Sequence, residues 1–417
     1  MKLTLKKIVV VLLTVAMIMV PMTFSFAAEP EVVKIAFTDP PTLNIGEMTI
    51  YHPSYAAMLA FKGGFEKYTA GRYVVELYPY GTLGDAASNL EQMLSGTLHG
   101  GTPADGALAP FYKNIQVFSI PYLFDSALTA YDILDGEFGQ KLVEDMAKTS
   151  GLRIIASYDN GGYRNFSNSK RQVKNADDMK GLKIRTMDIP VHMEIVKALG
   201  ASPTPIAFLE LYSALQTKVV DGQENSAITM LGASLQEVQP HVTLDGHLLG
   251  LAFLTISEDW FQSLSKEDQE ACLKAGREAS FAARGTVRYA ESFAIDTLKT
   301  QGVTVYSPTA EEMETFKIAQ EPAIKWLKDN IDASFVEELL ALVESGKVGT
   351  GVPPAATKQE PAAPAEPGAS ATPAPTTPAP SGGDTAKTAN NTILYVIIGA
   401  VVVLIAAFAL TRKQKKS

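Results

Sequence analysis

The sequence predicts an α/β fold for the body of the chain, roughly residues 30–348. Short apolar runs of strand length alternate there with segments whose apolar residues recur at helical spacing. Glycines precede four of the predicted strands, where a helix end or a turn needs a residue that tolerates a positive φ. They are Gly71, Gly151, Gly181 and Gly302. Capping-box patterns at Ser265 and Thr309 mark the starts of two later helices.

The expected elements follow in chain order. Strands are expected at residues 32–37, 73–78, 152–158, 182–187 and 303–306. Helices are expected at residues 52–69, 84–95, 128–149, 190–199 and 208–217. The pattern of residues 265–301 predicts one long helix, or two nearly collinear helices. A helix of that length could join two lobes.

The first 28 residues have the pattern of a secretory signal peptide. Three early lysines precede an apolar run at 8–20, and Ser25-Phe26-Ala27 places small residues where a signal peptidase cleaves. A retained membrane helix is the alternative, although the apolar run is short for a hydrocarbon core of roughly 30 Å. We therefore expect residues 1–28 to direct export.

The C-terminal segment has the pattern of a membrane anchor. Residues 393–410 are apolar and uncharged over a length that can span a bilayer, and the basic tail at 411–417 should stay in the cytoplasm. Residues 350–392 are dominated by Pro, Ala, Thr, Gly and Ser, a composition typical of a linker without a core. We expect a cell-membrane protein with a single pass and its body on the extracytoplasmic face.

Composition and motifs exclude several function classes. The net charge is −9, so the chain lacks the basic surface that nucleic-acid binding needs. The single cysteine, Cys272, excludes an intramolecular disulfide and a multi-cysteine metal site. The sequence has no G-x-S-x-G, H-E-x-x-H, P-loop or G-x-G-x-x-G motif. His241 and His247 could share a strand face as metal ligands, but surface or core histidines are the commoner case. We predict neither an enzyme nor a bound cofactor or metal.

The middle of the chain holds the most informative segments, and the first of them is interpreted as a strand followed by a Gly-rich turn. They are Tyr158-Asp-Asn-Gly-Gly-Tyr-Arg164, Asp178-Met-Lys-Gly-Leu-Lys-Ile-Arg185-Thr-Met-Asp188, Leu199-Gly-Ala-Ser-Pro-Thr-Pro205, Phe208-Leu-Glu-Leu-Tyr-Ser-Ala-Leu-Gln216 and Val219-Val-Asp-Gly-Gln-Glu-Asn225. Together they resemble the substrate-binding protein of tripartite ATP-independent periplasmic (TRAP) transporters, the dicarboxylate-receptor (DctP) family. Further matching segments lie in the N-terminal half. They are Ala70-Gly71-Arg72, Tyr78-Pro-Tyr-Gly-Thr-Leu-Gly-Asp85, Glu91, Gly96 and Ile120-Pro-Tyr-Leu-Phe124.

The resemblance covers about residues 31–346 and implies a fold. That fold is two-lobed and periplasmic-binding-protein-like, with a hinge, crossing strands and a long spanning helix, and it closes on its ligand by hinge motion. Lobe I would take approximately residues 29–161 and 250–290. Lobe II would take approximately residues 162–249 and 291–348.

The resemblance also implies binding residues. The family arginine that holds the substrate carboxylate corresponds to Arg185, and a second arginine corresponds to Arg164. A guanidinium presents a rigid fork that matches a carboxylate at two points, so the assignment is chemically consistent. Phe208 would wall the pocket against the apolar part of the ligand. Asn225 would form a hydrogen bond with it.

Four acidic residues in or near these segments are expected to have different roles. Glu91 matches a family position near the pocket, whereas Asp221 and Glu224 are interpreted as structural. Asp188 stands where sialic-acid-binding relatives carry an asparagine, three residues after Arg185. If its carboxylate faces the pocket, a dicarboxylate is disfavoured and a ligand with an amine or several hydroxyls fits better. An outward orientation is the alternative.

The implied function is an extracytoplasmic solute receptor. It would bind a small organic acid and deliver it to the small and large TRAP membrane subunits for ion-gradient-driven uptake. The anchor departs from Gram-negative relatives, which are commonly free in the periplasm, and suggests a cell without an outer membrane. A secreted enzyme is one alternative, but no base or nucleophile is visible beside Arg185. A ligand-sensing ectodomain is another, and the short tail at 411–417 would then require a separate signalling partner.

Overall fold

The computed structural model describes residues 29–346. The predicted signal peptide, linker, membrane helix and basic tail lie outside these residues. Within residues 29–346, no helix is both long and apolar enough to cross a membrane.

Most strands of the described residues are short, and two are long. They are β1 (Glu31–Ala36), β2 (Thr42–Ile45), β3 (Met48–Tyr51), β4 (Tyr73–Tyr78), β5 (Gly100–Gly101), β6 (Leu152–Asn168), β7 (Lys183–Thr186), β8 (Ser202–Pro205), β9 (Gly222–Asn225), β10 (His241–Ser257) and β11 (Thr304–Tyr306). In this part of the chain, β2 and β3 pair in a separate hairpin, and the other nine strands form one sheet. Its order is β4, β1, β5, β10, β6, β9, β7, β8, with β11 beside β10.

The helices of the described residues are α2 (Pro53–Tyr68), α3 (Ala86–Leu94), α4 (Asp105–Leu108), α5 (Ala127–Asp135), α6 (Glu137–Ser150), α7 (Pro190–Ala198), α8 (Leu211–Gln216), α9 (Ala227–Gly232), α10 (Glu258–Ser263), α11 (Lys266–Thr300), α12 (Ala310–Ala319), α13 (Glu321–Asn330) and α14 (Ala333–Ser345). Short 3-10 helices are η1 (Lys113–Ser119), η2 (Ala176–Met179), η3 (Phe208–Glu210) and η4 (Leu235–Glu237). The two helix starts predicted from capping patterns are confirmed. Ser265 accepts from the Asp268 backbone N–H, and Thr309 accepts from that of Glu312.

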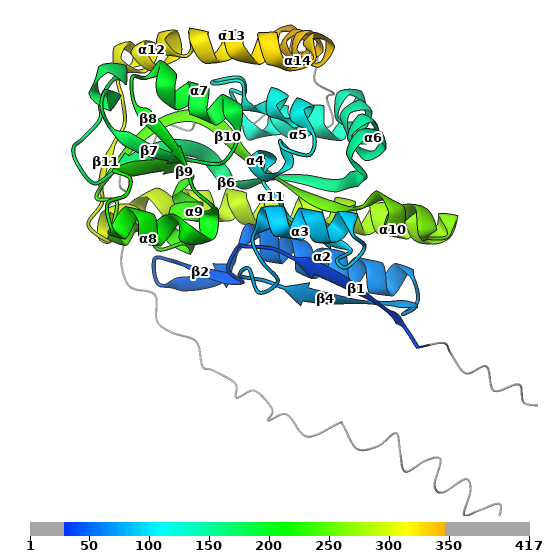
Figure 1. Ribbon diagram of the computed structural model, residues 1–417. Coiled ribbons are helices and arrows are strands. Elements are labelled where there is room, and N and C mark those ends of the chain that lie inside the picture. The colour runs from blue at the N-terminus through cyan, green and yellow to red at the C-terminus, as the bar shows by residue number, and fades with distance from the viewer. Residues whose placement is uncertain (1–28, 347–417) are drawn as a thin grey trace, which may run out of the picture. The chain divides into compact units, whose positions relative to one another are not determined.

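The long strands β6 and β10 join the two halves of the sheet. Each has 17 residues, and they pair antiparallel along most of their length. On one side the sheet continues through β5, β1 and β4, and on the other through β9, β7 and β8. Figure 1 shows α2 with β1 and β4 at one end of the body and α7 with α12–α14 at the other. The fold is therefore two-lobed with crossing strands, as predicted, and the residue bounds of the lobes stay a prediction.

The sequence predicted only the first part of β6 and no strand at 241–257. It interpreted the residues after Tyr158 as a Gly-rich turn, which is wrong, because the strand continues to Asn168. A β-bulge explains why the glycines looked like a turn. Tyr163 pairs with Leu249 and Asp159 with Leu251, so β6 accommodates extra residues between these two pairs. Gly161 and Gly162 lie in this bulge at φ values of 108° and 90°.

The long helix α11 is continuous from Lys266 to Thr300, so the one-helix alternative is correct. It packs against α2 and β6 (Figure 1). Small residues on its buried face permit this close approach. A Cβ at Gly276 would lie 2.3 Å from the Ile155 carbonyl oxygen, and Cys272 is fully buried on the same face.

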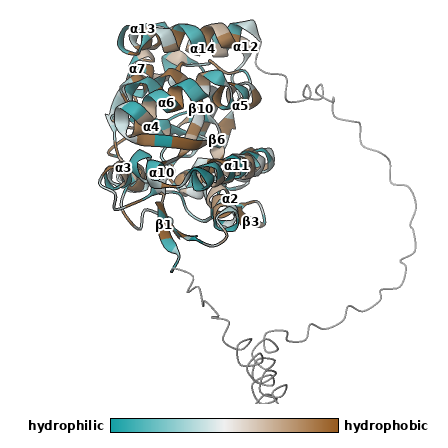
Figure 2. Cartoon of the chain, turned by 90° about the vertical axis from the view of Figure 1, so that its right-hand side faces the viewer, coloured by the Kyte–Doolittle hydropathy of each residue, from teal (hydrophilic) through white to brown (hydrophobic). Residues whose placement is uncertain are grey.

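The predicted helix at 128–149 is instead two helices, α5 and α6. They meet at Gly136, which ends one and begins the other. A side chain at Gly139 would overlap the Leu134 carbonyl, so the tight junction depends on this glycine as well. The helices in Figure 2 carry hydrophobic and hydrophilic residues together, as amphipathic helices that cover a core do. Phe118, Phe138 and Phe335 pack edge to face in that core.

Candidate functional site

Arg185 is a buried cation on β7, between β9 and β8. Its side chain is 2% exposed, and its Nε donates to the Ile206 carbonyl oxygen at 2.8 Å. No carboxylate of residues 29–346 lies within ion-pair distance of its guanidinium. Burial lowers the pKa of Arg185 to about 10, since Glu224 offsets only part of the cost and Arg164 adds a second positive charge. The remaining N–H groups of this guanidinium are therefore available to an anion.

Arg164 lies on β6 and is already paired with Glu224 on β9. Its Nε and Nη2 contact the two carboxylate oxygens, the second at 2.8 Å, and Nη2 also donates to the Glu224 backbone carbonyl at 2.7 Å. Burial opposes the charge of Arg164, but the adjacent carboxylate raises its pKa overall. The charge of Arg164 is thus neutralised by Glu224, whereas no carboxylate of the described residues forms an ion pair with Arg185.

Two histidines complete the surroundings of Glu224. His247 Nε2 lies 3.4 Å from Glu224 Oε2, and His192 Nδ1 lies 3.6 Å from Oε1. Burial alone would lower the pKa of His247, but Asp245, 2.7 Å from its Nδ1, and Glu224 raise it to about 9. The ring also stacks on Phe166, with centroids 4.3 Å apart. Although burial raises the pKa of Glu224, Arg164 and both histidines hold it well below its usual range.

This polar cluster was not predicted. Glu224 was interpreted as structural, and His247 was considered only as a partner of His241 in a metal site. Within the described residues no group of three or more metal-ligating side chains exists. The available signal was the unusual density of polar residues in the Asp221–Asn225 segment, but its partners lie on β6, α7 and β10, far away in sequence.

Asn225 and Phe208 lie on segments that adjoin Arg185. Asn225 is 3% exposed on β9, opposite Asn165 of β6, and its Nδ2 donates to Gln223 Oε1 at 2.7 Å. Phe208 begins η3, two residues after the carbonyl that holds Arg185, and is half-buried. The structure therefore brings Arg164, Arg185 and Asn225 onto three neighbouring strands.

Glu91 and Asp188 are placed differently. Glu91 is exposed in the middle of α3, and Asp188 is exposed between β7 and α7. Within residues 29–346, neither side chain forms an ion pair. No hydrogen bond or ion pair among the described residues joins either side chain to Arg185.

The opposite lobe approaches the end of β7 through the segment after β5. A Cβ at Gly106 would lie 2.7 Å from Met187 Sδ, which follows β7. Asp105 Oδ2 lies 4.0 Å from His192 Nε2 and accepts a hydrogen bond from Ser119. The carboxyl ends of β5 and β7 therefore face one another, the usual position of a ligand site in an open α/β sheet.

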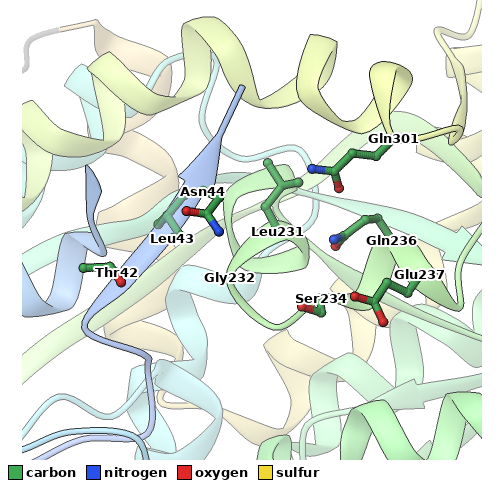
Figure 3. A pocket seen from close by; sticks show the side chains of 9 residues that line it. All are labelled: Thr42, Leu43, Asn44, Leu231, Gly232, Ser234, Gln236, Glu237 and Gln301. Carbon is green, nitrogen blue, oxygen red and sulfur yellow. The ribbon is translucent and has the colours of Figure 1, made fainter. Parts of the chain in front are cut away.

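One cavity of the described residues lies away from these arginines. It has a volume of about 420 Å³ and is lined by residues of β2, the end of α9 with η4, and Gln301 after α11 (Figure 3). Its lining contains Glu237 but neither arginine nor lysine, and none of the predicted binding residues. This cavity therefore offers no cation for a carboxylate.

A two-lobed body with crossing strands and a buried arginine at the carboxyl ends of its strands defines a binding-protein class of receptor. The chain belongs to the family of bacterial extracellular solute-binding proteins, family 7 (DctP), whose model matches residues 47–329. A solute-binding protein of Verminephrobacter eiseniae is 35% identical over 60% of this chain and 74% of its own length.

Two solved structures extend the similarity to the fold. The sugar-acid-binding protein of Advenella mimigardefordensis, in complex with galactonate, has a TM-score of 0.71 and 28% identity, over 76% of this chain and 99% of that one. A TRAP periplasmic solute-binding protein of Polaromonas, bound to D-erythronate, has a TM-score of 0.69 and 32% identity, over 75% and 98%. The predicted family and fold are confirmed.

Proposed function

We propose that this protein is a TRAP-transporter receptor that binds a small hydroxylated carboxylic acid through Arg185. Delivery of the bound acid to the small and large membrane subunits is the general role of the family. No catalytic step is part of this proposal. The site residues lie on β6, β7 and β9 and act by holding the ligand.

The observation that carries the proposal is the uncompensated charge of Arg185. A buried guanidinium without a counter-ion is costly, and an incoming carboxylate removes that cost while forming a two-point hydrogen-bonded pair. Arg164 cannot do the same in this state, because Glu224 occupies its fork. We therefore assign the carboxylate to Arg185 and give Arg164 a positioning role for β9.

The other predicted residues differ in how well they are placed to contact the ligand. Asn225, buried on the strand beside β7, is suited to hydrogen-bond a hydroxyl or carboxylate oxygen, and Phe208 offers an aromatic wall near the Ile206 carbonyl. Galactonate and D-erythronate, found in the two solved relatives, are both hydroxylated acids with one carboxylate. Exposed Glu91 and Asp188 would contribute only if hinge motion carried them into the cleft.

We further propose an anchored extracytoplasmic location. It rests on the sequence pattern of residues 1–28, the linker at 350–392 and the apolar segment at 393–410. Family membership supports the extracytoplasmic side, since relatives are periplasmic solute-binding proteins. Release from membranes by detergent, but not by high salt, would test the anchor.

A thermal-shift screen of the full chain against small carboxylic acids tests the binding assignment. A ligand at about 100 times its Kd should stabilise the protein by about 2.7 kcal/mol. This stabilisation should vanish in Arg185→Ala and persist in Arg171→Ala, which removes an exposed arginine that binds backbone carbonyls in the same part of the chain. An undiminished response in Arg185→Ala would contradict the assignment.

A further inference from the structure

A second, much smaller cavity lies in the lobe opposite Arg185. It is located where β1 and β5 end and α3 begins, and its volume is about 10 Å³. That is roughly the space of one water molecule or one hydroxyl group. Nine residues line it, and none carries a charge; the polar ones are Thr38, Asn89 and Thr102.

Two buried polar atoms of this cavity have no hydrogen-bond partner within residues 29–346. They are Asn89 Oδ1 and Thr102 Oγ1, and their side chains belong to residues that are 3% and 7% exposed. Native proteins rarely leave such atoms unpaired, because a buried polar atom without a hydrogen bond is costly. Asn89 Oδ1 is therefore suited to receive a partner from a ligand that enters the cleft. Thr102 Oγ1 neighbours the buried hydroxyl of Tyr158, and a ligand hydroxyl at this position would join both.

The cavity and Arg185 lie in opposite lobes, each near the carboxyl end of a strand. Gly101 and Thr102 stand at the carboxyl end of β5, and Arg185 stands near the carboxyl end of β7. The segment that follows Thr102 reaches Met187, two residues beyond Arg185, through Gly106. The two lobes therefore approach one another between this cavity and the end of β7.

The electrostatics of the cavity disfavour a second carboxylate. The N-terminus of α3 could attract an anion, but Asp85 already caps it, with Oδ1 2.8 Å from the Ser88 backbone N–H. Asp39, next to Thr38, is 5% exposed and adds another acidic group in this lobe. No lysine or arginine lines the cavity.

We infer that this cavity is a hydroxyl subsite that binds the distal hydroxyl of a monocarboxylic acid held at Arg185. A hydroxyl donates to Asn89 Oδ1 and shares a hydrogen bond with Thr102 Oγ1, whereas a methyl group leaves both unpaired and a carboxylate meets no cation. The receptor thus selects hydroxyl-terminated acids over deoxy acids and dicarboxylates. This selectivity rests on the proposed function and adds a second contact point to it.

Two series of acids that differ only at the carbon farthest from the carboxylate test the inference. The four-carbon series is D-erythronate, erythro-2,3-dihydroxybutanoate and meso-tartrate. The six-carbon series is D-galactonate, D-fuconate and galactarate. Isothermal titration calorimetry on the full chain should show, for the series that fits, a Kd about ten-fold lower for the hydroxyl-terminated acid than for either analogue, the effect of one hydrogen bond.

Substitutions that keep the side-chain volume nearly constant test whether the cavity residues cause the preference for a terminal hydroxyl. Asn89→Leu and Thr102→Val should each weaken the hydroxyl-terminated acid about ten-fold and leave the deoxy acid unchanged. Thr97→Val, an exposed control, should change neither. The Tm of each ligand-free variant reports folding. Asn89→Leu removes an unpaired buried atom and should not lower it, whereas Thr102→Val also removes the neighbour of the Tyr158 hydroxyl, so its Tm measures that contact separately.

The outcomes separate the two proposals. If every acid fails to bind the wild type, both the carboxylate assignment and the subsite are wrong. If Arg185→Ala abolishes binding while the Asn89 and Thr102 variants keep the wild-type preference, the receptor function stands and the subsite is wrong. Loss of the preference in either cavity variant, with deoxy-acid binding intact, establishes the subsite.

Discussion

Arg164 on β6 and Glu224 on β9 form a two-point ion pair, and both residues are less than a tenth exposed. The pair links the crossing strand β6 to β9, which lies between β6 and the strand of Arg185, β7. Glu224 also faces His247 and His192, so one carboxylate compensates several buried groups. Its removal should therefore affect more than a single contact.

Glu224→Gln should lower the free energy of unfolding by about 3–5 kcal/mol, because it leaves the Arg164 charge buried without a counter-ion. Urea denaturation measures this change. Glu237→Gln is the control, since Glu237 is exposed and a surface change usually stays within about 0.5 kcal/mol. Equal stabilities of the two variants would show that Arg164 is compensated in another way.

Arg185→Lys should bind the acid found in the thermal-shift screen about 10–100 times more weakly than the wild type. The lysine keeps the positive charge but loses the planar fork that grips both carboxylate oxygens. Titration calorimetry measures the loss. Full affinity in this variant would mean that charge alone, rather than two-point geometry, holds the ligand.

Stability should decrease with rising pH through the titration of His247. Its pKa is raised to about 9 in the folded state, against about 6.5 when unfolded. The protonated histidine therefore stabilises the fold fully below about pH 6.5, and this contribution is lost as the pH approaches 9, by on the order of 2–3 kcal/mol.

Urea denaturation between about pH 6 and pH 9 measures this dependence, which should be much weaker in His247→Gln. Glu291 needs a separate control, because burial raises its pKa to about 7. Its protonated form stabilises the fold below about pH 4.5, and that contribution is lost as pH rises through 7. Glu291→Gln should remove this lower part of the slope and leave the part above pH 7. An unchanged slope in His247→Gln would contradict the assignment.

Replacing two glycines of α11 by alanine, one at a time, should change the stability of the protein in opposite directions. Gly276→Ala places a Cβ 2.3 Å from the Ile155 carbonyl oxygen and should destabilise the protein, because helix and crossing strand must separate. Gly285→Ala meets no atom within 4 Å and should add up to about 1 kcal/mol through helix propensity. Thermal unfolding compares them, and a loss of stability in both would exclude close packing as the cause.

The sequence predicted those elements that local pattern specifies. The strand at 73–78 has the predicted bounds, and α11 begins and ends within a residue of its predicted range. In contrast, β10 and the second half of β6 have polar or glycine-containing sequence and become strands through pairing with each other. The junction of α5 and α6 also escaped prediction, because it depends on the contacts of Gly136 and Gly139.

At the site, too, the sequence predicted residues that belong to local motifs but not the contacts between residues that are far apart in the chain. The motif resemblance located Arg164, Arg185 and Asn225, and the structure places them on neighbouring strands. It could not show that Arg164 is already paired, since Glu224 is 60 residues away. Nor could it separate these residues from Glu91 and Asp188, which are exposed. The binding role of each residue stays a prediction.

The path of the two crossing strands also sets the order in which this protein can fold. β10 lies between β5 and β6 in the sheet, so neither lobe completes its half until residue 257 has been synthesised. Contacts of such sequence separation slow folding, because long loops must close first. The sheet pairings of both lobes can therefore be completed only after residue 257 has been made, late in the synthesis of the described residues.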